Sequence, residues 1–133
     1  MSGIKNITLL LKSMKPEQVK REFVFCTLSE EIFSKTKISP LLIFHEKEGV
    51  TIIIKKELAE KMNFSYQNVW AMITLTVHSD LAAVGFLAII TKKLAEEGIS
   101  VNAVSAYYHD HLFVPYEKAE RAMKALKEIS SLR

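Results

Sequence analysis

The sequence has little of the chemistry that holds small proteins together by means other than packing. Among its 133 residues there are four histidines and one cysteine, Cys26. A single cysteine excludes an internal disulfide bond and is typical of a reducing compartment. Cys26 lies in the apolar stretch FVFCTL, where a buried and unreactive thiol is the expected state. A chain of this length can bury a sufficient core without disulfides or a metal ion.

Long hydrophobic runs and strongly one-sided charge are also absent. The most apolar stretch, residues 81–90, is too short to cross a bilayer, and residues 1–15 lack the features of a secretory signal. The net charge of +3 comes from 18 basic and 15 acidic residues spread along the chain, so no basic patch indicates nucleic-acid binding. We therefore expect a cytoplasmic globular protein with neither a membrane nor a nucleic acid as partner.

The spacing of apolar residues predicts an α+β protein. Helical periodicity predicts helices over residues 4–14, 56–63, 81–97 and 117–129. Alternating or continuous apolar patterns predict strands over residues 22–28, 70–77, 99–108 and 111–115, and a hairpin within residues 40–54. Residues 29–37 are compatible with one helical turn or with a loop.

Residues suited to helix ends flank two of these helices. Ser2 is the expected N-cap of the first helix, and Ser79 or Asp80 that of the helix over residues 81–97. Gly98 suits the left-handed residue that ends this helix. On this interpretation Gly85 lies in the first helical turns, where a bulky residue is expected to block a ligand without unfolding the protein.

The two halves of the chain repeat one order of elements. Residues 22–64 and 70–130 each read strand, connection, strand, strand, helix, although they share little identity. This order fits two tandem ferredoxin-like βαββα units with antiparallel sheets. We place the units at residues 1–66 and 67–133.

The second half also resembles a known family. The stretches ITLTVHSDLAAVGF and YYHDHLFV closely resemble a family of small bacterial ACT-like proteins that was long described as a domain of unknown function. The stretches LLLKSMKPEQV, EFVFCTL and IFHEKEGVTIII are similar to the amino-terminal unit of that family, so the resemblance covers nearly the whole chain. The family is similar to the paired ACT domains that sense amino acids in larger proteins.

The resemblance implies a regulatory protein that binds an amino acid or a similar small metabolite at an interface between ACT units, without a cofactor. The loop over residues 78–85 corresponds to the place where ACT domains hold such ligands. The usual ACT unit is βαββαβ, whereas this chain ends on a helix, so the missing edge strand comes from the other half or from a second chain. This implies a homodimer. The ligand-binding residues expected on this basis are His78, Ser79, Asp80, Leu81, Val84, Gly85, Asn102 and Val104.

Residue types alone leave the loop over residues 78–85 open to two interpretations. A loop between a strand and a helix exposes the first backbone N–H groups of the helix, which favours binding of a carboxylate. In the simpler alternative, Ser79 or Asp80 only caps the helix and Gly85 only permits close packing. Asn102 is expected at the same end of the sheet as this loop, to bind the ligand or to complete local turn bonds.

The stretch His109-Asp110-His111 has three interpretations. A metal site needs further ligands, and His78 is the only obvious distant one. Catalysis needs a nucleophile, for which Ser79 with a histidine is weak evidence. We favour a hairpin turn in which Asp110 accepts bonds from backbone amides, with these three residues as secondary ligand contacts.

We therefore expect no metal ion and no catalytic residues. The alternative to a ligand-binding regulator is an interaction module that dimerises or docks on a metabolic enzyme.

Overall fold

A computed structural model describes residue 3 and residues 5–131 of the chain. The chain forms two compact units, which we describe separately. Unit 1 comprises Met1–Lys20 and Ala71–Arg133, and unit 2 comprises Arg21–Trp70. Strand β1 (Pro16–Leu28) begins in unit 1 and continues into unit 2.

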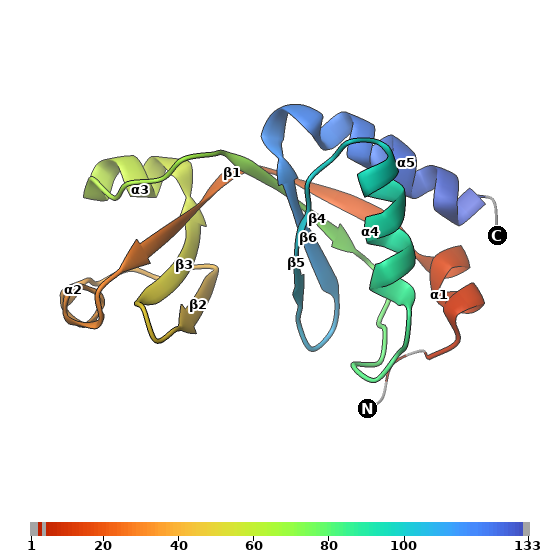
Figure 1. Ribbon diagram of the computed structural model, residues 1–133, viewed down its shortest axis with the longest axis horizontal. Helices are drawn as coiled ribbons and strands as arrows, with labels where there is room; N and C mark the ends of the chain where they lie inside the picture. The colour runs from red at the N-terminus through yellow and green to blue at the C-terminus, as the bar shows by residue number, and fades with distance from the viewer. Residues whose placement is uncertain (1–2, 4, 132–133) are drawn as a thin grey trace. The chain divides into compact units, whose positions relative to one another are not determined.

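Unit 1 has helices on one face of its strands (Figure 1). The strand order is β1-β4-β6-β5, and β5 pairs with β6 in antiparallel register from Asn102 opposite Phe113 to Ser105 opposite Asp110. Its elements besides β1 are α1 (Ile7–Ser13), β4 (Trp70–Leu75), α4 (Phe86–Glu96), β5 (Asn102–Ser105), β6 (Asp110–Pro115), the 3-10 helix η1 (Tyr116–Lys118) and α5 (Ala119–Ser131).

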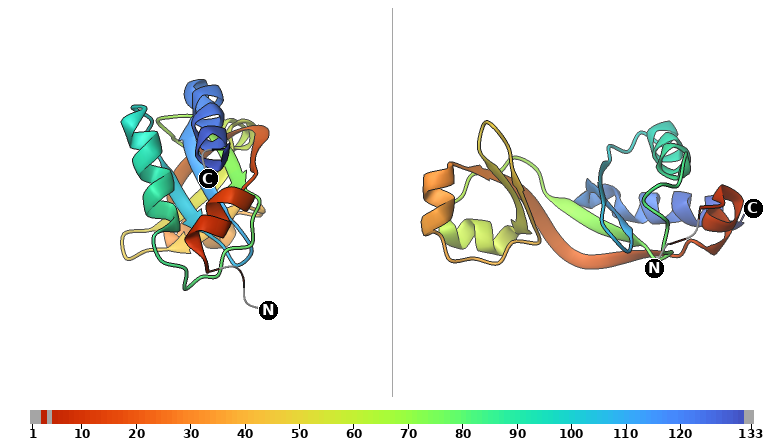
Figure 2. Two further views of the ribbon diagram at one scale, coloured as in Figure 1. Left: turned by 90° about the vertical axis from the view of Figure 1, so that its right-hand side faces the viewer. Right: turned by 90° about the horizontal axis from the view of Figure 1, so that it is seen from below.

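The core of unit 1 follows from the two periodicities of its sequence. Alternate residues of β4 point to the helices, and Ile73 and Leu75 are fully buried there. Helix α5 buries positions three or four residues apart, among them Ala122 and Leu126. Figure 2 shows α1, α4 and α5 from two further directions.

Unit 2 is a smaller layer of strands with two short helices. The strand order is β2-β3-β1, with β2 (Leu42–His45) and β3 (Val50–Lys55) forming an antiparallel hairpin. Helix α2 (Glu30–Lys35) begins where the Ser29 hydroxyl accepts a hydrogen bond from the Ile32 amide at 3.1 Å, and α3 is Lys56–Met62. Its core consists of Val24, Cys26, Leu28, Val50, Ile52, Ile54 and Ala59.

The structure confirms the predicted fold class, an α+β protein with antiparallel sheets. It also confirms the hairpin within residues 40–54 and a short helix that follows it directly, and it resolves residues 29–37 in favour of a helical turn.

The compact units divide the chain differently from the tandem order of its sequence. The boundary at residue 66 between ACT-like units stays a prediction. In the described part of the chain, no helix has the length and apolar character needed to span a bilayer.

Two expected helix starts are wrong. Helix α1 is capped by Asn6, whose side chain accepts the Leu9 amide at 2.9 Å, while the expected cap Ser2 lies outside the described residues. Helix α4 begins at Phe86, with Gly85 at its N-cap, rather than after Ser79 or Asp80. The physical reason is that Asp80 forms a turn of its own: its carboxylate accepts the Ala82 amide at 2.8 Å.

Candidate functional site

A cavity of about 230 Å³ lies where the loop before α4 meets the β5–β6 hairpin. All of its lining residues belong to unit 1. They are Ser79, Asp80, Leu81, Ala83, Gly85, Phe86, Leu87, Ala88, Ser105 and Asp110. The cavity therefore brings together the loop predicted as a ligand site and one of the predicted secondary residues.

A polar pair joins the two sides of the cavity. The Ser79 hydroxyl donates a hydrogen bond of 3.1 Å to Oδ2 of Asp110, and both side chains are buried. Asp110 is 6% exposed. Burial of a carboxylate costs free energy unless donors compensate it, so this bond helps to hold the loop against the hairpin.

The N-terminus of α4 lies at the cavity. Gly85 has no side chain to cap the helix, and the residues of the first turn, Phe86, Leu87 and Ala88, line the cavity. The first amides of a helix lack intrahelical acceptors and carry a partial positive charge. This part of the cavity suits a carboxylate group.

Gly85 has a conformational role that differs from the predicted one. Its φ of +88° lies in the left-handed region, and a Cβ atom there would lie 2.9 Å from Cδ1 of Ile7. The expectation that Gly85 lies within the first helical turns is therefore wrong, and its left-handed backbone strains any larger residue. That a bulky residue here blocks the ligand and leaves the fold intact stays a prediction. The predicted left-handed conformation of Gly98 is confirmed, with φ +73°.

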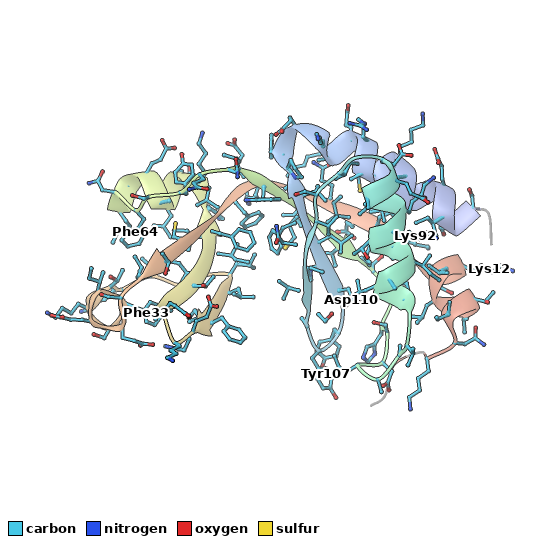
Figure 3. All side chains as sticks on the ribbon, in the orientation of Figure 1. Lys12, Phe33, Phe64, Lys92, Tyr107 and Asp110 are labelled. Atoms are coloured by element: carbon cyan, nitrogen blue, oxygen red, sulfur yellow. The ribbon has the colours of Figure 1, made fainter. Side chains whose placement is uncertain are left out.

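The hairpin turn lies just before the predicted one. The Ala106 amide donates to the carbonyl of His109 at 3.0 Å, so Tyr107 and Tyr108 form the tip. Tyr107 is labelled in Figure 3. Asp110 is the first residue of β6 and accepts a side-chain hydroxyl rather than turn amides. The expected hairpin is correct, but the role given to Asp110 is wrong, because its carboxylate turns inward to Ser79.

The side chain of His78 lies beside the tyrosines of the hairpin tip, and His78 is not among the residues that line the cavity. Its ring centroid is 5.5 Å from that of Tyr108 and 6.3 Å from that of Tyr107. Leu81 lines the cavity although its side chain is largely exposed, and Val84 is 81% exposed and outside the lining.

Asn102 and Val104 also lie outside the cavity lining. Ser105, next to the turn, lines the cavity, whereas Asn102 begins β5 at the end away from the turn. Side chains alternate along a strand, so Asn102 and Val104 lie on the face opposite to Ser105. The expectation that Asn102 lies at the same end of the sheet as the loop is wrong.

The two histidines around Asp110 do not form a metal site with it. His111 Nδ1 lies 2.9 Å from Oγ1 of Thr74 on the neighbouring strand β4, and the rings of His109 and His111 are 6.2 Å apart. Burial, and then the charge of His109, lower the pKa of His111, while the carboxylate of Asp110 acts in the opposite direction. Within the described residues, no group of three or more histidine, cysteine, aspartate or glutamate side chains is placed to hold a metal ion.

Sequence reasoning missed five lining residues: Ala83, Phe86, Leu87, Ala88 and Ser105. Ser105 was accessible to prediction, because a turn over residues 106–109 places it opposite Asp110. The lining residues of α4 could not be predicted, because the sequence pattern puts the start of that helix at residue 81 and the structure puts it at Phe86.

Comparisons with known proteins agree with this architecture. A sequence model of the ACT domain matches residues 2–71, and a second model of the ACT domain matches residues 65–128. The chain belongs to the ACT domain family. These matches confirm the two tandem ACT-type units inferred from the sequence. No curated protein sequence matches the chain.

Solved structures include proteins that are similar to this chain. A protein of unknown function from Vibrio cholerae, described as a possible transport protein, is 43% identical, with 97% of this chain and 99% of that chain covered and a TM-score of 0.85. The ligand-free regulatory subunit of aspartate kinase from Thermus thermophilus is 11% identical, with 89% of this chain and 99% of that chain covered and a TM-score of 0.65. At this identity the second likeness shows the fold alone.

Proposed function

We propose that this ACT protein is a regulatory protein that binds a free amino acid or a similar small metabolite in the cavity of unit 1. The main support is the pairing, in one cavity, of an uncapped helix start with a buried carboxylate. The helix amides favour a carboxylate group of the ligand, and Ser79, Ser105 and Asp110 offer polar contacts. The family contains regulatory domains, and the similar aspartate kinase subunit is a regulatory one.

Part of the proposal is that the protein acts without catalysis and as a homodimer in the cytoplasm. Strands β5 and β2 end the strand orders of units 1 and 2, so their outer edges are available for pairing with a second copy. An ACT unit of that second copy would complete the ligand site, as expected for binding at an ACT–ACT interface.

Thermal denaturation with each proteinogenic amino acid tests this function. A ligand that binds the folded state raises the melting temperature, and the rise grows with the logarithm of the ligand concentration relative to Kd. Ser105→Tyr fills the cavity from an edge strand that tolerates aromatic residues, and we expect it to abolish the shift. Ala103→Tyr, on the same strand and face but outside the lining, is the matched control and keeps it. Equal shifts in both variants would place the ligand elsewhere.

A second function, as an interaction module, is favoured by exposed apolar side chains around the cavity. Leu81, Val84, Tyr107 and Tyr108 are all exposed and belong to the loop and the hairpin tip. Apolar groups gathered in this way are typical of contact surfaces. If this function is correct, a Tyr107→Ser, Tyr108→Ser double variant loses self-association or enzyme binding in sedimentation experiments, and no amino acid shifts the melting temperature.

A further inference from the structure

Asp110 is a buried carboxylate with little compensation. Within the described part of the chain, its side chain makes one hydrogen bond, from the Ser79 hydroxyl to Oδ2, and no ion pair. In that part of the chain, every side-chain oxygen that solvent does not reach has a hydrogen-bond partner. Oδ1 of Asp110 is therefore not sealed from solvent, and Asp110 is one of the residues that line the cavity.

The ionisable side chains that line the cavity are acidic. Asp80 and Asp110 line it, and among the described residues no lysine, arginine or histidine does. Each carboxylate accepts one hydrogen bond, Asp80 from the Ala82 amide and Asp110 from the Ser79 hydroxyl. The two differ in burial: Asp80 is half-buried, whereas Asp110, labelled in Figure 3, is buried and has less water to compensate its charge.

A buried carboxylate with one neutral donor is best completed by a cation that brings further N–H donors. A protonated amine has this chemistry, because it supplies a positive charge and three N–H groups. The first turn of α4, whose residues also line the cavity, favours negative charge near the helix N-terminus. The two preferences together match a zwitterion.

We infer that Asp110 is the residue that selects ligands carrying a protonated primary amine, so that the cavity takes amino acids and rejects carboxylic acids of the same shape without the amine. This inference rests on the proposed function, in that it requires a small molecule to bind in this cavity.

The test compares matched ligands by calorimetry. The probes are the L-amino acid with the largest thermal shift, the corresponding carboxylic acid without the amino group, and the N-acetyl derivative. Wild-type protein is expected to bind the amino acid about ten- to hundredfold more tightly than either analogue. Asp110→Asn is expected to remove this preference by weakening amino-acid binding to the level of the carboxylic acid, whose own affinity stays unchanged.

The ratio of the affinities for the amino acid and the carboxylic acid separates recognition of the amine from a purely structural role of Asp110. If Asp110 only supports the fold, Asp110→Asn weakens both ligands equally and the preference for the amine persists, which overturns the inference. Asp80→Asn tests the other carboxylate of the lining. It keeps the preference for the amine if Asp110 is the selecting residue, and loss of the preference in Asp80→Asn but not in Asp110→Asn overturns the inference.

Two outcomes measured on the wild-type protein alone test the inference even if Asp110→Asn fails to fold. Equal affinity for the amino acid and its carboxylic-acid analogue overturns the inference and leaves the proposed function intact. If none of the amino acids, carboxylic acids or N-acetyl derivatives binds, the proposed function fails and the inference fails with it.

Discussion

The hydroxyl of Ser79 lies 3.1 Å from Oδ2 of Asp110, although the two residues are 31 positions apart in the chain. This hydrogen bond connects the loop before α4 to the first residue of β6. It occurs at the cavity and buries two polar side chains together. The stability of the fold and the shape of the cavity therefore depend on the same contact.

Removal of this hydroxyl is expected to destabilise the protein. Ser79→Ala leaves the buried carboxylate of Asp110 without its donor, which costs about 1–3 kcal/mol in the free energy of unfolding. Urea denaturation measures the change. Ser105→Ala is the control, because Ser105 also lines the cavity but is exposed, and its change stays within about 0.5 kcal/mol. Equal stability of the two variants would show that Asp110 does not depend on Ser79.

Two glycines with the same backbone conformation separate strain from crowding. Gly98→Ala meets open space at φ +73°, so it costs only the left-handed strain of about 1–2 kcal/mol. Gly85→Ala at φ +88° costs this strain and also the contact of 2.9 Å with Cδ1 of Ile7. Denaturation should show Gly85→Ala to be the more destabilising. Adding Ile7→Val, which removes Cδ1, should recover part of the difference, and full additivity would contradict this explanation.

The pKa of His111 makes stability depend on pH. Burial, with His109 as the second cause, lowers this pKa below the usual value of about 6.5, so the folded protein binds fewer protons than the unfolded chain. The stability contributed by neutral His111 is full above about pH 7 and is lost as the pH falls through 6.5 toward the lower folded-state pKa. Urea denaturation at several pH values should show a weaker loss in His111→Gln.

The part played by His109 can be measured directly. In His109→Gln the pKa of His111 is expected to rise, because one repulsive charge is removed while burial and the attraction of Asp110 remain. Titration of the His111 ring protons by NMR follows this shift. An unchanged midpoint in His109→Gln would assign the lowered pKa to burial alone.

The expected homodimer can be tested together with the edge that forms it. Light scattering of the wild-type protein at high concentration should give twice the mass of the chain, and a monomer would contradict the proposal. Phe44→Lys places a charge at an exposed position of β2, and Ala103→Lys does so on β5. The variant that dissociates identifies the pairing edge, because edge lysines oppose strand pairing.

The sequence by itself determined the class of fold and the family. Helix α5 and the β2–β3 hairpin were predicted because their signals are local: buried residues at helical spacing in one, and two apolar runs around Gly49 in the other. The resemblance of both halves to ACT units also needed no coordinates, and the family matches over residues 2–71 and 65–128 confirm it.

Only the tertiary structure decided which residues meet at the cavity. Ser79 looked like a helix cap and Asp110 like a turn residue, since each fits a common local role. Their long-range contact replaces both roles, because the buried carboxylate of Asp110 needs a hydrogen-bond donor and the folded chain brings the Ser79 hydroxyl to it. Asn102 was misplaced for the complementary reason. Strand alternation separates it from Ser105, and the turn over residues 106–109, visible only in the folded chain, decides which of the two faces the cavity.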